Sequence, residues 1–247
     1  MTYDRINLVL PTRKRVPHLA KFIESAVATA KNVDSLYLTV LVDGDDFDTT
    51  NYLIHNPPKI PLKVVWWDGV VPHLGEMYNV LYDYSSPALD VNTTVVSMVG
   101  DDMVFATPGW DERILREINA RNGWAVVSLN DDYIQRGKIF VNVFTTRKIV
   151  EATGGSFMSE EFNMDFIDVV WTHLARLTGT DVYLPDVVLR HEHSSVAGDD
   201  TRERLRATRS LFTGGMRRAL QIAEEYAPRV REAMARDGFT PTGVRNA

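Results

Sequence analysis

Hydrophobic and polar positions alternate along the first half of the chain in blocks that fit strands and helices in turn. Four short, continuous apolar runs predict buried strands: residues 6–10, 36–42, 62–67 and 94–99. Three longer stretches, with apolar residues at three- or four-residue spacing, predict helices: residues 17–30, 73–84 and 108–120. Strands and helices that alternate in this way are typical of an α/β domain with a mostly parallel sheet.

The second half of the chain continues with shorter elements and then changes in character. Its predicted elements are four strands and one amphipathic helix: residues 124–129, 139–145, 182–184 and 187–190, and residues 166–177. After residue 193 a polar loop leads into two arginine-rich helical stretches, split by Gly214 and Gly215. We therefore predict a main domain, residues 1–193, and a helical C-terminal extension, residues 194–247, which packs on it or on a second copy of the chain.

Composition narrows the chemistry. The 247 residues, 45% of them hydrophobic, suit a large globular domain, and the absence of cysteine excludes disulfides, thiolate zinc sites and cysteine nucleophiles. A bound metal would be held by Asp, Glu, His, Asn and water, which favours Mg²⁺ or Mn²⁺. Residues 1–10 lack the apolar core of a signal peptide, and no run is long enough to span a membrane. We expect a cytoplasmic protein with no integral membrane segment.

The charge is unevenly distributed. The net charge of −6 disfavours a broad nucleic-acid surface, yet residues 201–238 contain nine arginines and five acidic residues. A solvated helical face explains this excess most simply. The alternative is an arm that meets an anionic acceptor, such as modified DNA.

The strongest chemical signal is the segment V-V-S-M-V-G-D-D-M at residues 95–103. An apolar strand there delivers Gly100, Asp101 and Asp102 to its carboxyl end, where open α/β sheets bind ligands. Two adjacent carboxylates repel one another unless a positive charge lies between them, and Mg²⁺ or Mn²⁺ bridging a diphosphate would supply it. The alternative is a solvated acidic turn.

A second acidic loop, V-D-G-D-D-F-D-T-T at residues 42–50, also follows a buried strand. A carboxylate at this edge can accept a hydrogen bond from a nucleobase N–H or a ribose hydroxyl, which makes Asp43 and Asp45 candidate ligands. Turn formation and helix capping are the alternative, and they explain Asp46 and Asp48 best.

These segments carry a family resemblance. Residues 42–50 resemble the V-D-D-G-S-x-D-x-T loop of family 2 glycosyltransferases, and L-P-T-R-K-R at residues 10–15 is similar to their P-T-Y-N-R segment. V-G-D-D at residues 99–102 resembles their D-x-D region, with Val99 where the first Asp often stands. The resemblance implies a GT-A (Rossmann-like) fold and a nucleotide-sugar, most often UDP-linked, bound by one set of residues: Pro11, Thr12, Arg13, Arg15, Asp43, Asp45, Gly75, Asn79, Gly100 and Asp101.

The same resemblance implies a catalytic base and a metal. In the family an E-D pair opens a late helix and its Asp deprotonates the acceptor. By position Asp168 has that role here, with Ile167 in place of the Glu, and a base opposite the leaving diphosphate gives inversion. His191, where the family often has a histidine, would complete a metal site with Asp101 and Asp102. A hydrogen-bonded structural histidine is the alternative.

Acceptor-side residues form the last group of candidates. Pro108 to Asp111 resembles the segment that follows the metal loop in the family, and Trp110 could stack on a sugar beside Asp111. Asp165 and His193 are weaker candidates for the same side, and Asp165 could instead cap a helix.

The sequence therefore predicts a metal-dependent glycosyltransferase with an acceptor hydroxyl on a glycan, a small molecule or modified DNA. One alternative is a sugar-phosphate nucleotidyltransferase, although residues 10–15 lack the glycine-rich phosphate loop usual in that class. Another is a non-catalytic module that binds carbohydrate or a partner on the same fold.

Overall fold

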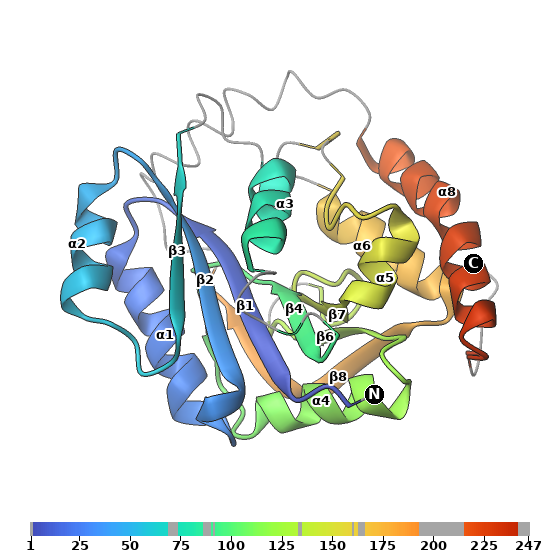
Figure 1. The fold of residues 1–247 in the computed structure, drawn as a ribbon, viewed down its shortest axis with the longest axis horizontal. Coiled ribbons are helices and arrows are strands. Elements are labelled where there is room, and N and C mark those ends of the chain that lie inside the picture. The colour runs from blue at the N-terminus through green and yellow to red at the C-terminus, as the bar shows by residue number, and fades with distance from the viewer. Residues whose placement is uncertain are drawn as a thin grey trace.

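Two layers of helices cover the two faces of one curled sheet (Figure 1). The computed structural model describes residues 2–68, 74–85, 90, 92–132, 135–159, 161–162, 166–192 and 215–241.

The sheet contains eight strands in the order β3-β2-β1-β4-β7-β6-β8-β5. β1, β2, β3 and β4 run parallel, as do β6 and β8, whereas β7 is antiparallel to both of its neighbours and β5 is antiparallel to β8. The strand bounds are β1 (Arg5–Thr12), β2 (Leu36–Asp43), β3 (Leu62–Trp67), β4 (Thr94–Met98), β5 (Met103–Phe105), β6 (Val126–Asn130), β7 (Val143–Thr146) and β8 (Asp181–His191).

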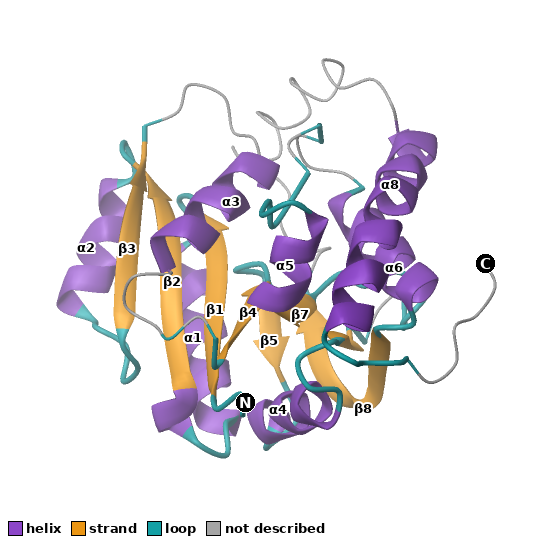
Figure 2. Ribbon diagram, turned by 45° about the vertical axis from the view of Figure 1, so that its right-hand side comes forward, coloured by secondary structure: helices purple, strands orange, loops and turns teal. Residues whose placement is uncertain are grey.

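Helices divide between the two faces and bury a separate apolar cluster on each (Figure 2). One face carries α1 (Val16–Thr29), α2 (Phe47–His55) and α4 (Trp110–Ala120), and a short 3-10 turn, Val33–Ser35, precedes β2. The other face carries α3 (Leu74–Ser85), α5 (Arg147–Thr153), α6 (Ile167–Thr178) and α8 (Gly215–Arg236). The central strands are covered on both sides, which is why they are continuous apolar runs instead of alternating ones.

The expected mixed, mostly parallel α/β architecture is confirmed, with three differences in detail. β5 and α5 have only three and seven residues, too few for a periodic pattern to show. β8 is one strand across Pro185 because the β6–β8 register shifts after Leu129, from a partner at Leu184 to one at Val188. Pro185 therefore lies in the irregular stretch, where its lack of an N–H group removes no hydrogen bond between β6 and β8.

α8 packs against α5 and α6 and shares their core. Its buried side chains are Ala219, Ile222, Ala223, Ala227, Val230 and Met234. Three of its arginines bind the main body: Arg218 pairs with Glu161, Arg229 donates to the carbonyl of Thr153 at the end of α5, and Arg231 donates to the carbonyl of Leu177 at the end of α6. These contacts favour the simpler explanation for the basic residues of α8.

The earlier arginine-rich stretch, residues 201–213, lies outside the described residues, so the division into residues 1–193 and 194–247 stays a prediction. No helix in the described ranges is long and apolar enough to cross a membrane.

If α8 belongs to the same cooperative core, Ile222→Ala should lower the free energy of unfolding by about 2–4 kcal/mol, because it leaves a cavity under the helix. Met216→Ala, an exposed apolar position on the same helix, should change it by less than about 0.5 kcal/mol. Urea unfolding followed by tryptophan fluorescence measures both. Equal effects would mean that α8 unfolds separately from the sheet.

Candidate functional site

Four strand ends bring the charged residues of the site to one edge of the sheet. From β1 the chain runs outward to β2 and β3 on one side and then continues with β4 on the other, so β1 and β4 flank the point where the strand order reverses. Arg13 and Arg15 follow β1, Asp43 ends β2, Asp101 follows β4 and His191 ends β8. Ligands of open α/β sheets bind at such a point.

Asp102 and His191 meet because β5 pairs with β8. Met103 lies opposite His191 in that pair, and the backbone N–H of Glu192 donates to the Asp102 carbonyl at 2.8 Å. The result is a distance of 3.4 Å between His191 Nε2 and Asp102 Oδ1. A side chain at Gly100 would collide with Asp102, since its Cβ would lie 2.7 Å from Oδ1. Glycine here makes room for the carboxylate of Asp102.

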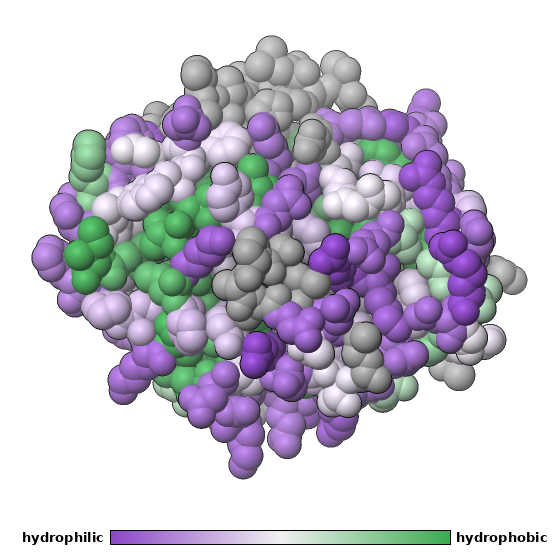
Figure 3. Space-filling view, in the orientation of Figure 1, coloured by the Kyte–Doolittle hydropathy of each residue, from purple (hydrophilic) through white to green (hydrophobic). Residues whose placement is uncertain are grey.

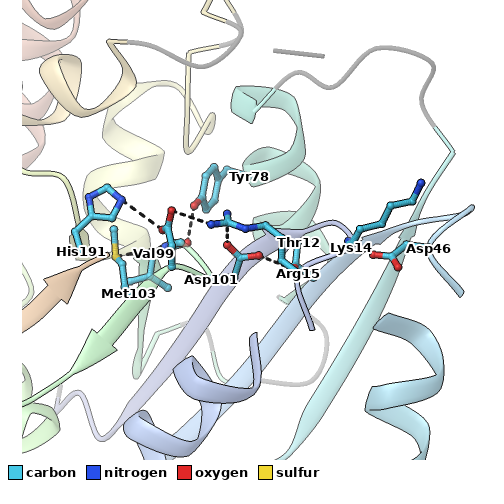
Figure 4. A network of polar contacts seen from close by, with 11 residues as sticks. Thr12, Lys14, Arg15, Asp46, Tyr78, Val99, Asp101, Met103 and His191 are labelled. Atoms are coloured by element: carbon cyan, nitrogen blue, oxygen red, sulfur yellow. Dashed lines mark hydrogen bonds and ion pairs between the residues drawn. The ribbon is translucent and has the colours of Figure 1, made fainter. Parts of the chain in front are cut away.

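Arg15 bridges the two carboxylates (Figure 4). Its Nη1 donates to Asp101 Oδ1 at 2.6 Å, and its Nη2 lies 3.3 Å from Asp102 Oδ2. The other oxygen of Asp101 accepts from the hydroxyl of Thr12 at 2.7 Å. Asp101 is only 3% exposed, so these charge-assisted bonds replace the water that an ionised carboxylate requires.

The electrostatics of this group follow from the contacts. Burial alone would raise the pKa of Asp102, but the hydrogen bonds and charges of His191 and Arg15 outweigh it and hold the pKa well below its usual range. Burial, reinforced by the negative charges of Asp102 and Asp101, raises the pKa of Tyr78 far above its usual value. Tyr78 therefore stays neutral and donates to the Val99 carbonyl at 2.6 Å, which fixes the strand end before the acidic pair.

Arg13 closes the neighbouring acidic loop. Its Nη1 lies 2.6 Å from Asp43 Oδ2, and its Nη2 lies 2.8 Å from Asp45 Oδ2. The hydrogen bond to Arg13 lowers the pKa of Asp45 to about 2. The two acids that the sequence offers as nucleotide ligands are thus ion-paired with an arginine from the adjacent strand end.

Asp46 fixes the backbone between the two arginines. Its Oδ1 accepts from Thr49 N at 3.1 Å and caps α2, and its Oδ2 accepts from Lys14 N at 2.5 Å. Lys14 has φ +51°, a conformation that a non-glycine residue holds only with such support. Arg13 and Arg15, on either side of Lys14, pair with acids at the ends of β2 and β4, the two strands that flank β1.

The pair of Asp102 and His191 fits two positions of a metal shell. Two ligand atoms that each lie about 2.1 Å from a metal ion, with a ligand–metal–ligand angle of about 90° to about 109°, are about 3.0–3.4 Å apart. The separation of Asp102 Oδ1 and His191 Nε2 matches this range. Within the part of the chain that the structure describes, no group of three acidic or histidine side chains could hold a metal. A cation bound here would take its other ligands from a bound molecule or water.

The acceptor-side prediction for Trp110 and Asp111 is wrong. Trp110 is fully buried and stacks on Phe105 with ring centroids 4.0 Å apart, so no sugar can reach its ring. Asp111 is 1% exposed and accepts from the backbone N–H groups of Lys31 and Asn32, which anchors the loop after α1. Both residues stabilise the fold below the site.

Gly75 and Asn79 have packing roles in the structure, and nucleotide binding by them stays a prediction. A Cβ on Gly75 would lie 2.6 Å from the Ser159 carbonyl oxygen, so this glycine permits close approach of the chain to α3. The Asn79 amide donates to Ser156 Oγ and the Met158 carbonyl and accepts from Met158 N. Its amide holds that loop.

Asp168 lies in the first turn of α6, half-buried, and its Oδ1 accepts from Val169 N at 2.9 Å. α6 connects to β8 through two residues, 179 and 180, so the start of α6 lies toward the carboxyl edge of β8. Asp165 and His193 lie outside the described residues.

An aromatic chain links α6 to the acidic loop. Trp171, one turn after Asp168, lies 5.7 Å from Phe157 between ring centroids, and Phe157 lies 6.4 Å from Tyr78. Since Tyr78 donates to Val99, these rings set the position of α6 relative to the acidic pair.

Sequence reasoning missed Tyr78 and Trp67, and it missed the contact of Asp46 with Lys14. Trp67 ends β3 directly beside Asp43 in the parallel ladder, so the two side chains lie on the same face of the sheet. Its indole Nε1 is buried and has no hydrogen-bond partner in the described structure. The signal was present in W-W at residues 66–67, because alternation puts one of the two rings on the site face.

Comparison with known proteins supports the fold. No protein-family model and no curated protein matches the sequence. Among solved structures, the chain is similar to the mannosyltransferase PcManGT from Pyrobaculum calidifontis in complex with GDP-Man and Mn²⁺, with TM-score 0.60, 15% identity, and coverage of 96% of this chain and 76% of that one. The fold is that of the GT-A glycosyltransferases.

S. aureus TarS shows the same likeness. TarS 1–349 in complex with UDP has a TM-score of 0.61 and 14% identity, and the match covers 91% of this chain and 71% of that one. TarS 1–349 in complex with UDP-GlcNAc has a TM-score of 0.59 and 12% identity, with 91% and 72% covered. At these identities the GT-A fold is what the likeness establishes.

Because Asp46 both caps α2 and holds Lys14, Asp46→Ala should lower the free energy of unfolding by about 1–3 kcal/mol. Asp48→Ala, a charge in the first turn of the same helix, should cost less than about 1 kcal/mol. Thermal unfolding of the two variants gives the comparison. A larger loss for Asp48→Ala would contradict the assignment of the cap to Asp46.

Proposed function

We propose that this GT-A protein transfers a sugar from a nucleotide-sugar to an acceptor hydroxyl, with inversion of the anomeric configuration. The resemblance to family 2 glycosyltransferases favours a UDP-linked sugar. The observation that carries the proposal is the group of Arg15, Asp101, Asp102 and His191 at the switch point of the sheet. Cationic and anionic groups are interleaved there at hydrogen-bonding distance. Such a group can bind a diphosphate and a divalent cation together.

The donor would lie along the ends of β1, β2 and β3. Arg13 and Arg15 would bind the phosphates through their guanidinium groups. The carboxylate of Asp43 would accept a hydrogen bond from the nucleobase, and the indole N–H of Trp67 beside it would donate one. Pro11 and Thr12 end β1 between these two parts, where the resemblance expects nucleotide contact. The arrangement gives phosphate and base separate, adjacent partners.

Asp102 and His191 would hold Mn²⁺ or Mg²⁺ with the diphosphate, and Asp101 beside them adds negative charge. A divalent cation at this position offsets the charge that develops on the leaving diphosphate. Gly100 keeps Asp102 in place by leaving its carboxylate room. The low pKa of Asp102 keeps it ionised, which a ligand of a hard cation requires.

Asp168 is the proposed base. A carboxylate at the start of α6, across the edge from the acidic loop, could take the proton of the acceptor hydroxyl as that oxygen attacks the anomeric carbon. Attack from the side opposite the leaving diphosphate inverts the anomeric configuration. The acceptor could be a glycan, a small molecule or modified DNA.

Mass spectrometry of products from UDP- and GDP-sugars with Mn²⁺ and an acceptor panel tests transfer directly. Asp168→Asn should lower transfer by about 10²–10⁴-fold because the base is lost, while nucleotide binding persists. Asp181→Asn, at the opposite end of β8, serves as the control and should retain activity. Full activity in Asp168→Asn would exclude it as the base, and no nucleotide binding at all would contradict the proposed function.

Trp67→Phe should weaken UDP binding by about 3- to 10-fold, since it removes one hydrogen-bond donor and keeps most of the ring. Trp66→Phe is the matched control, because alternation puts that neighbouring ring on the opposite face, where it is 55% exposed. Isothermal titration calorimetry with UDP measures both variants. Equal affinities for all three proteins would remove Trp67 from the donor site.

A further inference from the structure

Arg15 already supplies the positive charge that the two carboxylates need. Its guanidinium bridges Asp101 at 2.6 Å and Asp102 at 3.3 Å and is itself 15% exposed. Arginine stays charged at any physiological pH, so this neutralisation is present before a ligand arrives.

A cation entering this state would meet a like charge. To use the carboxylates of Asp101 and Asp102 it would have to lie beside the Arg15 guanidinium in a partly buried site, where repulsion between like charges is weakly screened. The second oxygen of Asp101 is already bonded to Thr12. A cation held by Asp102 Oδ1 and His191 would share the Asp102 carboxylate with Arg15, whose guanidinium lies at Oδ2, so release of the guanidinium strengthens cation binding.

A diphosphate competes with Asp101 and Asp102 for the guanidinium of Arg15. Its anionic oxygens match the planar fork of a guanidinium at least as well as two separate carboxylates do. The side chain can move without the backbone, because Lys14 N is fixed to Asp46 and the turn holds its conformation. Exchange of partners is thus a rotation of one side chain.

We propose that Arg15 exchanges Asp101 and Asp102 for the donor diphosphate, and that this exchange opens the acidic pair to a divalent cation. The inference rests on the proposed function and adds an order to it: the nucleotide binds before the cation or together with it, and the cation does not bind first. Arg15 is the residue that couples the two events.

Electron paramagnetic resonance of free Mn²⁺, with and without UDP, tests the order. Wild-type protein should bind Mn²⁺ at least about tenfold more tightly with UDP than without it, within the usual range of coupling between sites. Arg15→Met should bind Mn²⁺ alone about tenfold more tightly than wild type, because the competing charge is gone. Lysine carries a point charge that cannot bridge both carboxylates, so the Mn²⁺ affinity of Arg15→Lys should lie between those of wild type and Arg15→Met.

Arg113→Met is the control, since Arg113 forms a comparable ion pair with Asp186 on the exposed side of α4 and should leave Mn²⁺ binding unchanged. Adding Asp102→Asn to Arg15→Met should abolish the gain. If Arg15→Met does not fold, Arg15→Lys and the UDP dependence of the wild type decide the question.

Two outcomes separate this inference from the proposed function. UDP binding with Mn²⁺ affinity that is the same with and without UDP would overturn the role of Arg15 and leave the proposed function standing. A Mn²⁺ affinity that is unchanged in both Arg15 variants would also overturn the role of Arg15 and leave the proposed function standing. Failure of UDP and GDP to bind under any condition would overturn both.

Discussion

The bridge from Arg15 to Asp101 and Asp102 is the interaction on which the edge of the sheet depends. Two adjacent carboxylates, 3% and 15% exposed, would repel one another and lose hydration without a cation between them. Arg15 follows β1, and the two carboxylates follow β4, the strand next to it. The ends of these two central strands therefore supply both the positive and the negative groups of the bridge. Removing one side would leave a buried charge unpaired, at a cost of about 3–5 kcal/mol.

Long-range pairing brings the remaining groups to this bridge. The three residues of β5 fold back onto the end of β8, and that pairing places His191 beside Asp102. Lys21 of α1 then holds Glu192, the next residue, with its Nζ at 2.5 Å and 2.6 Å from the two carboxylate oxygens. The face shown in Figure 3 mixes polar and apolar areas. The charges at the edge of the sheet are paired across elements far apart in sequence.

The sequence predicted the parts of the structure that local patterns control. Buried strands, and the acids that follow them, were visible because a strand covered on both faces is continuously apolar and its end is abruptly polar. Trp110 was misplaced because the family resemblance assigned it to the acceptor side, while its burial depends on Phe105 from β5, a strand too short to recognise. Asp46 was recognised as a turn or cap, but its second contact, to Lys14, exists only in the folded sheet.

The two departures from the family motifs have a common physical explanation. Val99, where an Asp often stands, is 1% exposed in the apolar cluster under the sheet, and only its carbonyl reaches Tyr78. Ile167, where a Glu often stands, is 3% exposed in the cluster on the other face, beside the rings of Phe157 and Trp171. A carboxylate at either position would be buried among apolar side chains, which is costly. Because these positions face the core in this chain, the acidic groups that remain, Asp101, Asp102 and Asp168, are those on its polar edge.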